Sequence, residues 1–540
     1  MSIDLSLDRL ERLVSHLPPY TRPTLHIAGT NGKGSVSALL TSILRASAPP
    51  LRVGRYNSPH LVSIYDCITL DDVPVSPEVY ASARAEIEEA DAKHGTKLSS
   101  FELLTLAALR VFEKERVDVV VLEVGMGGRL DATNIVPDNA IAVSALAAVD
   151  LDHQFFLGET VELIAREKAG IGRAGRPFVL GKQRHSSVEG EVKNVLDTFN
   201  AALVRALDVK KVDWDEQRDG PKTSPFSLSF EAATATAFGK PAPQPVVVDL
   251  PCFSSPVRAL LPLYGAHQLD NLGTALTVIN SLLTLSPLSN DASLNFKKRI
   301  TAGTVAEGVK KVSWPGRLSF HTLQVSIPSP PASTSAPILP SNLKQKKYRL
   351  VVLADGAHNP ASAETLGAYV THLLDLALAS SPTSIRTVNL TYILSLSHSP
   401  PKTPLQTLSP ILPPKIPSSL ASSNMGVNIS VAVLRFSPPE GMPWVKSVPP
   451  ADLHTVVSHL VPNANIWVAD DDAYPPPTAS NGKNLALEDA LKWAAKNQDR
   501  AQKEAGDGTK CGNLVVLAGS LYLVADFYRL LEAEKKQEQV

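Results

Sequence analysis

A short glycine-rich segment carries the clearest chemical signal in the sequence: residues 29–35 read Gly-Thr-Asn-Gly-Lys-Gly-Ser. It lies between an apolar run that ends at Ala28 and a stretch whose apolar residues have helical spacing. Glycines let backbone N–H groups approach phosphate oxygens, a helix N-terminus favours anions, and Lys33 adds a positive charge. The segment therefore predicts a phosphate-binding loop. Its position between a strand and a helix disfavours the alternative, a glycine-rich turn that binds nothing.

The loop departs from the common phosphate-loop pattern at the residue after its lysine. In the pattern G-x-x-x-x-G-K-[ST] a hydroxyl residue stands there and holds Mg²⁺, whereas this chain has Gly34. A metal must then take ligands from elsewhere. Glu123 is a candidate because it ends a β-branched run, where an acid beside a phosphate loop can bind Mg²⁺ or orient water. A strand-end glutamate is otherwise an ordinary solvated residue, so this interpretation depends on the loop.

Three further groups have residue types that suit a ligand site. His153 follows a predicted strand, Lys168 lies within a predicted helix, and the turn 355–360 places Asp355 and His358 after another strand. Ligands bind at the carboxyl ends of strands in open α/β sheets. Each group also has an ordinary alternative, as an exposed or structural histidine or as a charged helix face. We expect His153 to be a ligand only if it shares a sheet with Lys33 and Glu123.

Alternating strand and helix patterns must position these residues. The first half predicts a doubly wound α/β domain, with strands at 25–28, 51–56, 117–124, 141–149 and 178–180 and helices at 36–44, 77–93, 99–115, 160–171 and 188–207. The second half repeats the pattern, with strands at 348–355, 388–396, 427–434, 465–469 and 514–518 and helices from 360, at 485–496 and to about 534. We therefore expect two α/β domains, residues 1–312 and 313–540.

Three stretches interrupt the pattern. Residues 214–246 are polar and contain prolines, residues 328–340 hold five prolines in thirteen, and residues 400–417 hold seven in eighteen. Such composition favours extended, solvated loops, so we expect surface insertions. A site for a proline-recognising partner is the alternative.

Composition excludes several classes of protein. The chain has 52 Lys and Arg against 53 Asp and Glu, a net charge of -1, which disfavours binding to nucleic acid through phosphates. Its three cysteines are far apart, so they form neither a disulfide framework nor a zinc cluster. No apolar run reaches the roughly 20 residues of a membrane span, and the first residues do not resemble a signal peptide. We expect a cytoplasmic protein without a membrane partner, and a monomer because no interface is apparent.

Nine motifs, taken in order, resemble the folylpolyglutamate synthase and dihydrofolate synthase family, a branch of the Mur-ligase-like ATP-dependent amide ligases. They lie at residues 26–35, 58–61, 99–102, 122–134, 151–153, 167–171, 267–271, 314–318 and 355–360. The resemblance implies a Mur-ligase-like P-loop central domain that binds ATP and pteroate, and a smaller Rossmann-like C-terminal domain that serves the ligation of glutamate.

The resemblance also implies roles for particular residues. Lys33, His153 and Lys168 match catalytic positions, and Lys168 matches the lysine that is carbamylated in this family. The Mg²⁺ ligands would be Ser58, Glu123 and His153, with Ser58 supplying the hydroxyl that is missing after Lys33. Nucleotide contacts would come from Asn31, Gly32, Lys33, Gly34, Ser35, Asn271, Arg317, Asp355 and His358. A pterin-binding patch would comprise Ser99, Phe101, Leu130, Asp131 and Ala132. Whether a second Mg²⁺ or a monovalent cation also binds is left open.

The two activities of the family differ in their acceptor for glutamate. Residues 128–134, Gly-Arg-Leu-Asp-Ala-Thr-Asn, resemble dihydrofolate synthases and bifunctional bacterial enzymes, and 436–444 and 519–523 resemble fungal dihydrofolate synthases. The resemblance therefore implies ligation of L-glutamate to 7,8-dihydropteroate through an acyl phosphate, which consumes ATP. After Leu394 the chain lacks the glycine- and lysine-containing loop that is frequent in the family, so the glutamate site stays open. The alternatives are a folylpolyglutamate synthase, a bifunctional enzyme, a non-catalytic nucleotide binder or a proline-rich scaffold.

Overall fold

The computed structural model describes residues 6–222, 226, 228, 240–328, 345–380, 385–417, 426–442, 444–473, 483–505 and 510–538. The chain divides into two units. The first comprises Met1–Pro221 and Pro243–Trp314, and the second comprises Lys222–Ala242 and Pro315–Val540. The change at Trp314–Pro315 lies two residues beyond the boundary expected from the sequence, and the segment Lys222–Ala242 groups with the second unit although the sequence places it inside the first.

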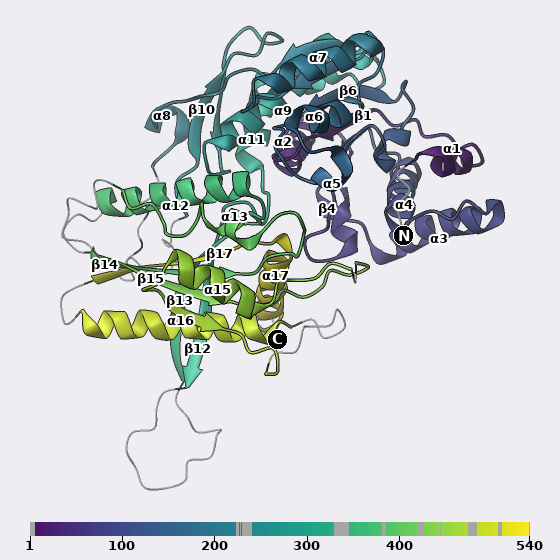
Figure 1. Ribbon diagram of the computed structural model, residues 1–540. Coiled ribbons are helices and arrows are strands. Elements are labelled where there is room, and N and C mark those ends of the chain that lie inside the picture. The colour runs from purple at the N-terminus through teal and green to yellow at the C-terminus, as the bar shows by residue number, and fades with distance from the viewer. Residues whose placement is uncertain are drawn as a thin grey trace. The chain divides into compact units, whose positions relative to one another are not determined.

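The first unit is built on an eight-stranded sheet with the order β4-β3-β2-β5-β1-β6-β7-β8 (Figure 1). Its strands are β1 Thr24–Ala28, β2 Val53–Tyr56, β3 Ile68–Leu70, β4 Val73–Pro74, β5 Val119–Glu123, β6 Ile141–Leu146, β7 Pro177–Leu180 and β8 Ala202–Arg205. Neighbouring strands are parallel across the part of the sheet that runs β2-β5-β1-β6-β7-β8. At the other edge, β3 pairs antiparallel with β2, and β4 pairs antiparallel with β3. β1 therefore lies between β5 and β6, which is the point where successive connections turn to opposite sides and where ligands bind in such sheets.

Helices connect these strands. The unit contains α1 Asp8–Val14, α2 Lys33–Arg45, α3 Pro77–His94, α4 Ser100–Lys114, α5 Gln154–Leu157, α6 Val161–Ala169, α7 Ser187–Phe199, α8 Glu216–Asp219, α9 His267–Thr284, α10 Phe296–Arg299 and α11 Ala302–Lys311, with 3-10 turns η1 Ile64–Cys67, η2 Ala132–Ile135 and η4 Pro287–Asn290. A small antiparallel sheet, β11-β10-β9, adds β9 Lys210–Lys211, β10 Gln244–Val248 and β11 Val257–Leu261.

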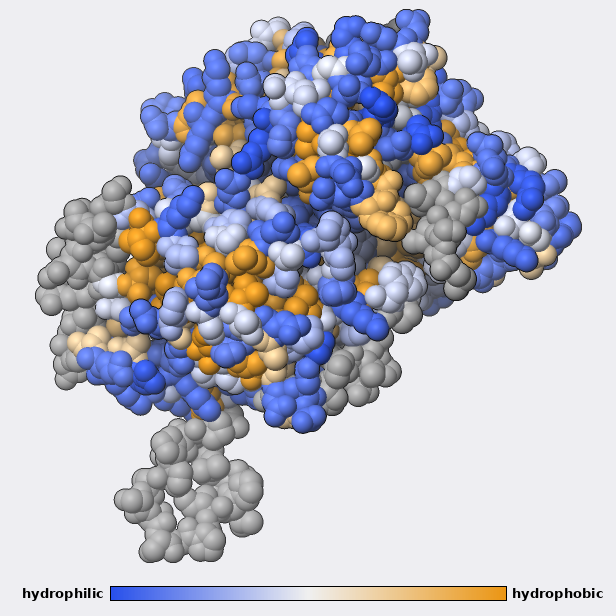
Figure 2. Space-filling view, viewed as in Figure 1, coloured by the Kyte–Doolittle hydropathy of each residue, from blue (hydrophilic) through white to orange (hydrophobic). Residues whose placement is uncertain are grey.

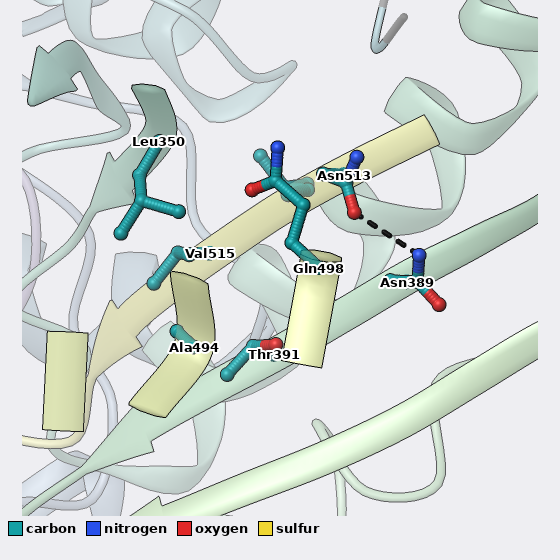
Figure 3. A pocket seen from close by; sticks show the side chains of 8 residues that line it. Leu350, Asn389, Thr391, Ala494, Gln498, Asn513 and Val515 are labelled. Carbon is teal, nitrogen blue, oxygen red and sulfur yellow. Dashed lines mark hydrogen bonds between the residues drawn. The ribbon is translucent and has the colours of Figure 1, made fainter. Parts of the chain in front are cut away.

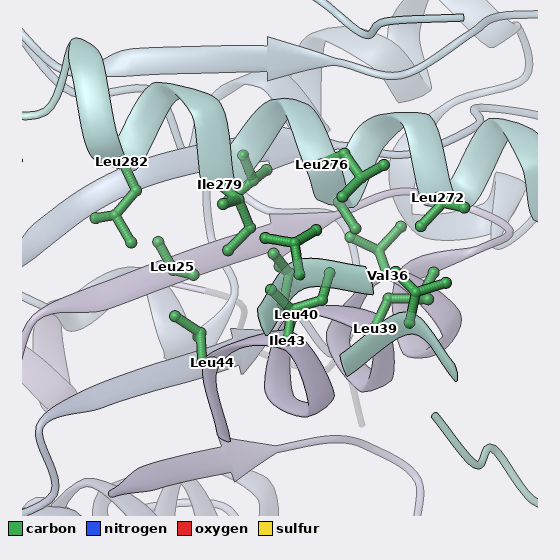
Figure 4. Close-up of a cluster of buried hydrophobic side chains, with 14 of the residues drawn as sticks. Leu25, Val36, Leu39, Leu40, Ile43, Leu44, Leu272, Leu276, Ile279 and Leu282 are labelled. Carbon is green, nitrogen blue, oxygen red and sulfur yellow. The ribbon is translucent and has the colours of Figure 1, made fainter. Parts of the chain in front are cut away.

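The core behind the phosphate loop is formed by α2, α9 and the sheet. Every residue from Ser35 to Leu44 of α2 is buried, and leucines of α9 and its one isoleucine, Ile279, pack on them (Figure 4). Burial of a leucine or isoleucine side chain stabilises a fold by roughly 1.5–3 kcal/mol. This packing fixes the start of α2, and with it the loop that precedes α2, against a rigid support.

One predicted helix is shorter than the sequence suggested. The expectation of a helix over 188–207 is wrong in its second half, because α7 ends at Phe199 and β8 follows at the edge of the sheet. Asn200 ends the helix in the left-handed conformation, with φ 52°. Asparagine adopts this conformation at helix C-termini at little cost, and that signal favours a turn before the apolar pattern of β8.

The second unit contains a six-stranded sheet with the order β12-β13-β17-β14-β15-β16. Its strands are β12 Ser319–Pro328, β13 Gln345–Ala354, β14 Ile385–Leu394, β15 Gly426–Val433, β16 Asn465–Val468 and β17 Lys510–Ala518, and its helices are α12 Pro360–Ser380, α13 Pro404–Leu408, α15 Pro450–Leu460, α16 Leu485–Glu504 and α17 Leu521–Glu538. All neighbouring strands are parallel except β12 and β13. Helices α12 and α16 cover opposite faces of this sheet (Figure 1). The doubly wound α/β fold class expected from the sequence is confirmed.

The three interrupting stretches have different outcomes. The expectation of a solvated loop over 400–417 is wrong: α13 begins there with a capping box at Thr403, and Leu408, Ile411 and Leu412 are fully buried. Within 214–246, Phe226 and Leu228 are also buried, and the backbone N–H of Asn513 in β17 donates to the carbonyl of Leu228. Residues 329–340 lie outside the described residues. Among the described helices, none combines the length and the apolar character needed to cross a bilayer.

Candidate active site

The phosphate loop lies at the carboxyl end of β1 and ends in the first turn of α2. Gly32, which precedes α2, has φ 91°, a conformation that favours glycine. A Cβ atom at Gly32 would lie 2.3 Å from the side-chain oxygen of Asn271. A Cβ atom at Gly34 would lie 2.5 Å from the indole ring of Trp314. The two glycines thus keep the loop backbone bare where an incoming phosphate would meet N–H groups.

Two lysines converge on one carbonyl oxygen of this loop. Lys33 Nζ lies 3.1 Å from the oxygen of Gly29, and Lys168 Nζ, from α6, lies 3.0 Å from the same atom. Lys33 Nζ also lies 3.8 Å from Oε1 of Glu123. The structure therefore brings Lys33, Lys168 and Glu123 together.

Lys168 is the less ordinary of the two lysines. It is only 4% exposed, and burial, reinforced by the nearby charge of Lys33, lowers its pKa from 10.5 to about 7. The carboxylates of Asp152 and Asp131 act in the opposite direction but do not compensate. A large fraction of Lys168 is consequently a neutral amine near neutral pH, and a neutral amine is a nucleophile.

Glu123 is placed by strand register. It pairs with Ile27 across the parallel β1–β5 ladder, so its carboxylate lies at the same edge of the sheet as Gly29. It is 6% exposed and accepts a hydrogen bond from the side-chain amide of Asn57, the residue before Ser58. A buried carboxylate is tolerated there because Lys33 compensates its charge and Asn57 donates a hydrogen bond to it.

The loop after β6 forms the other wall of the site. Thr30 Oγ1 donates to the carbonyl of Asp150 over 3.0 Å and accepts from the N–H of Asp150 over 3.1 Å. Three residues later, His153 begins α5 in the left-handed conformation, with φ 51°, and lies exposed. Among the described residues there is no group of three or more His, Cys, Asp or Glu side chains able to hold a metal by themselves. A metal at Glu123 and His153 would therefore rely on a hydroxyl such as that of Ser58 and on ligand oxygens.

The start of α9 contributes a short amide chain. Asn271 Nδ2 donates to Gln268 Oε1 over 3.0 Å, and Gln268 Nε2 donates to Ser35 Oγ over 3.2 Å. The three side chains are nearly fully buried. These hydrogen bonds hold Asn271, a predicted nucleotide contact, against the loop at Gly32 and position the Ser35 hydroxyl. Gln268 was not singled out from the sequence, although its spacing of three residues from Asn271 places both on one helix face.

The predicted pterin patch combines two elements. Ser99 caps α4 through its hydroxyl, and Phe101 packs on the loop after β5, because a Cβ atom at Gly125 would lie 2.3 Å from its ring. Leu130 is half-buried, and Ala132 is buried. The structure thus brings Phe101 to the loop that carries Leu130 and Ala132, while the contact of these residues with a pterin stays a prediction.

Asp131 holds this loop together from inside. One carboxylate oxygen accepts from the N–H of Met126 over 2.8 Å, and the other accepts from the N–H and the hydroxyl of Thr133 over 3.0 and 2.6 Å. Nε2 of the fully buried His26 lies 2.9 Å from the Thr133 hydroxyl, which links the loop to β1. Burial lowers the pKa of His26 to about 3, so the imidazole ring in this network is neutral.

Replacing Asp131 by alanine should lower the free energy of unfolding by about 3 kcal/mol, because several buried donors lose their acceptor and each costs roughly 1–3 kcal/mol. Urea unfolding followed by circular dichroism measures this difference. The matched control is Asp197→Ala, which removes a carboxylate that is 62% exposed and paired only with Lys193. A loss for Asp131→Ala no larger than for the control would contradict the structural role.

The remaining predicted nucleotide contacts lie in the second unit, around the end of β13. Asp355 is 7% exposed; its carboxylate accepts from the N–H groups of Leu318 and Ala357 over 2.8 and 2.9 Å. Burial raises its pKa, an effect that the charge of Arg317 opposes. His358 Nδ1 and Arg317 Nη1 each donate to a glycine carbonyl, that of Gly356 over 2.8 Å and that of Gly316 over 2.9 Å. The unit thus gathers Arg317, Asp355 and His358 at one sheet edge.

A cleft in the second unit lies apart from these residues. It is lined by Leu350, Asn389, Thr391, Ala494, Gln498, Asn513, Leu514 and Val515 (Figure 3). An amide chain crosses three strands beside it: Asn428 donates to Asn389 over 3.1 Å, and Asn389 donates to Asn513 over 3.0 Å. The cleft contains none of the residues singled out from the sequence and lies between α16 and the middle of the sheet.

A mostly parallel sheet with a glycine-rich loop at its switch point, two converging lysines and a strand-end carboxylate are features of the P-loop class of α/β folds, here followed by a second α/β unit. The chain is 31% identical over 532 residues to the dihydrofolate synthetase of Saccharomyces cerevisiae, covering 98% of each protein. It belongs to the folylpolyglutamate synthase and dihydrofolate synthase family.

Other comparisons agree on this family and fold. A profile described as the C-terminal domain of dihydrofolate synthetase matches residues 340–530. The folylpolyglutamate synthase of Mycobacterium tuberculosis, complexed with ADP and AMPPCP, is 24% identical with a TM-score of 0.66, over 97% of this chain and 95% of that chain. A bifunctional folylpolyglutamate synthase/dihydrofolate synthase with Mn, AMPPNP and L-glutamate bound is 22% identical with a TM-score of 0.59, over 98% of this chain and 95% of that chain. The Mur-ligase-like fold expected from the sequence is confirmed.

Proposed function

We propose that this chain is an ATP-dependent ligase that joins L-glutamate to 7,8-dihydropteroate, giving dihydrofolate, ADP and phosphate. The observation that carries the proposal is the convergence of Lys33 and Lys168 on the Gly29 carbonyl, beside the carboxylate of Glu123. Full-length similarity to a yeast dihydrofolate synthetase supports the choice of dihydropteroate as acceptor. ATP and a divalent metal are supported by the ligands of the structurally similar enzymes.

The site suits Mg²⁺ in the chemistry of its donors. Mg²⁺ is usually held by one or two carboxylates together with substrate phosphates and water. Glu123 offers one buried carboxylate at the phosphate loop, and we propose Ser58 and His153 as the further ligands. When bound, the metal would neutralise phosphate charge and orient the transferring group.

The reaction needs activation of a carboxylate, which is a poor electrophile. The pteroate carboxylate attacks the γ-phosphorus of ATP, ADP leaves, and an acyl phosphate forms. The loop N–H groups and Lys33 stabilise the negative charge that develops on the transferring phosphoryl group. The amine of glutamate then attacks the acyl carbon, and the tetrahedral intermediate expels phosphate. Exclusion of water protects the acyl phosphate from hydrolysis.

Lys168 has a separate proposed role as the site of a carbamate. Its neutral amine can add to CO₂, lose a proton and become a carbamate, which exchanges a cation for an anion. The depressed pKa, about 7, is the property that this addition requires. With a carbamate on Lys168, the ammonium of Lys33 would lie beside an anion. With an ammonium on Lys168, it would lie beside a second cation.

The second unit carries three further residues whose motifs indicate a nucleotide contact. We propose that Arg317, Asp355 and His358 contact ATP, on the strength of their motifs and of their gathering at the end of β13.

Mass spectrometry of the purified protein with ATP, Mg²⁺ and L-glutamate tests the proposed function. One reaction receives 7,8-dihydropteroate and a second receives tetrahydrofolate. We expect a product one glutamate heavier from dihydropteroate. Omission of L-glutamate is the control, because ADP release without it would indicate only hydrolysis of the acyl phosphate or of ATP.

The other outcomes separate the alternatives. Extension of tetrahydrofolate alone would replace the proposal by a folylpolyglutamate synthase, and extension of both acceptors would make the enzyme bifunctional. Binding of ATP without glutamate-dependent ADP release from either acceptor would favour the non-catalytic nucleotide binder.

A further inference from the structure

Two phenylalanines that follow His153 expose their rings on the surface of the first unit. Phe155 is 84% exposed and Phe156 is 38% exposed, and their rings meet edge to face with centroids 5.0 Å apart. Leu151 and Leu163, in the same stretch, are 43% and 39% exposed. Figure 2 shows hydrophobic residues interrupting the hydrophilic surface in the region of α5 and α6. Large apolar side chains exposed together commonly mark a binding surface.

The segment that carries these rings is tied to both loops of the candidate active site. At its start, Asp150 exchanges two hydrogen bonds with Thr30 of the phosphate loop. At its end, Leu157 packs beneath the loop after Glu123, since a Cβ atom at Gly127 would lie 2.9 Å from its side chain. Only six residues separate these ties, so Phe155 and Phe156 lie close to the edge of the sheet where Gly29 and Glu123 lie.

The short helix α5 turns the two rings outward. Leu157, on the inner side, is 8% exposed and belongs to the buried cluster with Val124 and Ile164. The rings of Phe155 and Phe156 are left at the rim, directly after the proposed ligand His153. The described residues leave most of the Phe155 ring uncovered, and a ligand with a flat apolar face at the reacting centre would cover it.

The two acceptors of this family differ at the atoms beside the reacting carboxylate. In dihydropteroate that carboxylate is attached directly to a benzene ring. In a folate it ends the flexible side chain of a glutamate, which carries a second, charged carboxylate. Phenylalanine rings pack well on a benzene ring, with stacked or edge-to-face geometry, but offer no partner to a carboxylate.

We propose that Phe155 and Phe156 bind the benzoyl ring of dihydropteroate and so select an aromatic acid over a glutamyl tail. The inference rests on the proposed function and adds a specificity determinant to it. The substrate is then the group that covers this surface, and not a second protein or another part of the chain.

The test compares Phe155→Ala and Phe156→Ala with the wild-type enzyme in steady-state kinetics. We expect the KM for dihydropteroate to rise roughly tenfold in each variant, as loss of an aromatic contact implies, and the KM values for ATP and glutamate to stay within about twofold. Phe155→Tyr keeps the ring and should restore the KM. Because Phe155 is 84% exposed, its replacement should leave the thermal unfolding midpoint unchanged.

The matched control is Leu285→Ala, which removes an apolar side chain that is 52% exposed at the far end of α9. An unchanged KM for dihydropteroate in both phenylalanine variants would overturn the inference while the wild-type activity upholds the proposed function. A similar rise in the KM values for dihydropteroate, ATP and glutamate would also overturn the inference, because it would indicate that the two rings support the protein structure and do not contact one substrate. A wild-type enzyme that is inactive with dihydropteroate would refute the proposed function itself.

Discussion

Replacing Lys33 by alanine is expected to lower the rate of glutamate-dependent ADP release from dihydropteroate at least a hundredfold. Loss of a preorganised charge partner at a transition state costs on the order of 3 kcal/mol, which corresponds to about that factor. A second effect acts in the same direction. The charge of Lys33 helps to lower the pKa of Lys168, so its removal raises that pKa and leaves less neutral amine. Coupled measurement of ADP at saturating substrates gives the rate.

The control for Lys33→Ala is Lys193→Ala, which removes a lysine that is 63% exposed and paired only with Asp197. We expect this control to keep the wild-type rate, because exposed ion pairs contribute little. Circular dichroism should show both variants folded, since Lys33 lies at the start of α2 and is not part of its buried face. Near-normal turnover of folded Lys33→Ala would contradict the assignment of the phosphate loop.

The sequence predicts the phosphate loop well because the chemistry of such a loop is a local property. The β-branched run before Glu123 and the short run before Gly29 are typical of buried parallel strands. The structure adds that the two strands pair, which brings both carboxyl ends to one edge of the sheet. The prediction that Gly32 and Lys33 bind phosphate rests on one short segment, residues 29–35. The doubly wound fold follows from the alternation of the two kinds of pattern.

Other features depend on contacts between residues far apart in the sequence, which no local pattern contains. Asn57 is next to the predicted ligand Ser58, yet only the β2–β5 pairing shows that it donates to Glu123. Trp314 belongs to a recognisable motif, but its place against Gly34 is a tertiary contact. Proline content suggested a solvated loop over 400–417, whereas the burial of Leu408 reflects packing that overrides composition.

The depressed pKa of Lys168 is another such feature, since a Glu-Lys pair in a helix is usually solvated. α6 instead directs Lys168 inward to the Gly29 carbonyl, where burial and Lys33 both disfavour its charge. With a pKa of about 7 the amine is roughly nine-tenths neutral at pH 8 and about one-tenth neutral at pH 6. Only the neutral form adds CO₂, so formation of the proposed carbamate should increase as the pH rises through 7.

Replacing Lys168 by alanine is accordingly expected to lower the rate by a hundredfold or more, and small carboxylates such as formate or acetate should restore part of it. The substitution opens space beside Gly29 for an anion that mimics the carbamate. Lys168→Arg is the matched control, because it fills the space with a fixed cation that cannot be carbamylated; it should be equally slow and should not respond to carboxylates. In the wild-type enzyme, added bicarbonate should raise the rate more at pH 7 than at pH 8, where more of the amine is already neutral. Absence of rescue in Lys168→Ala at every carboxylate and pH tested would remove the carbamate from the mechanism and leave Lys168 as a structural contact of the phosphate loop.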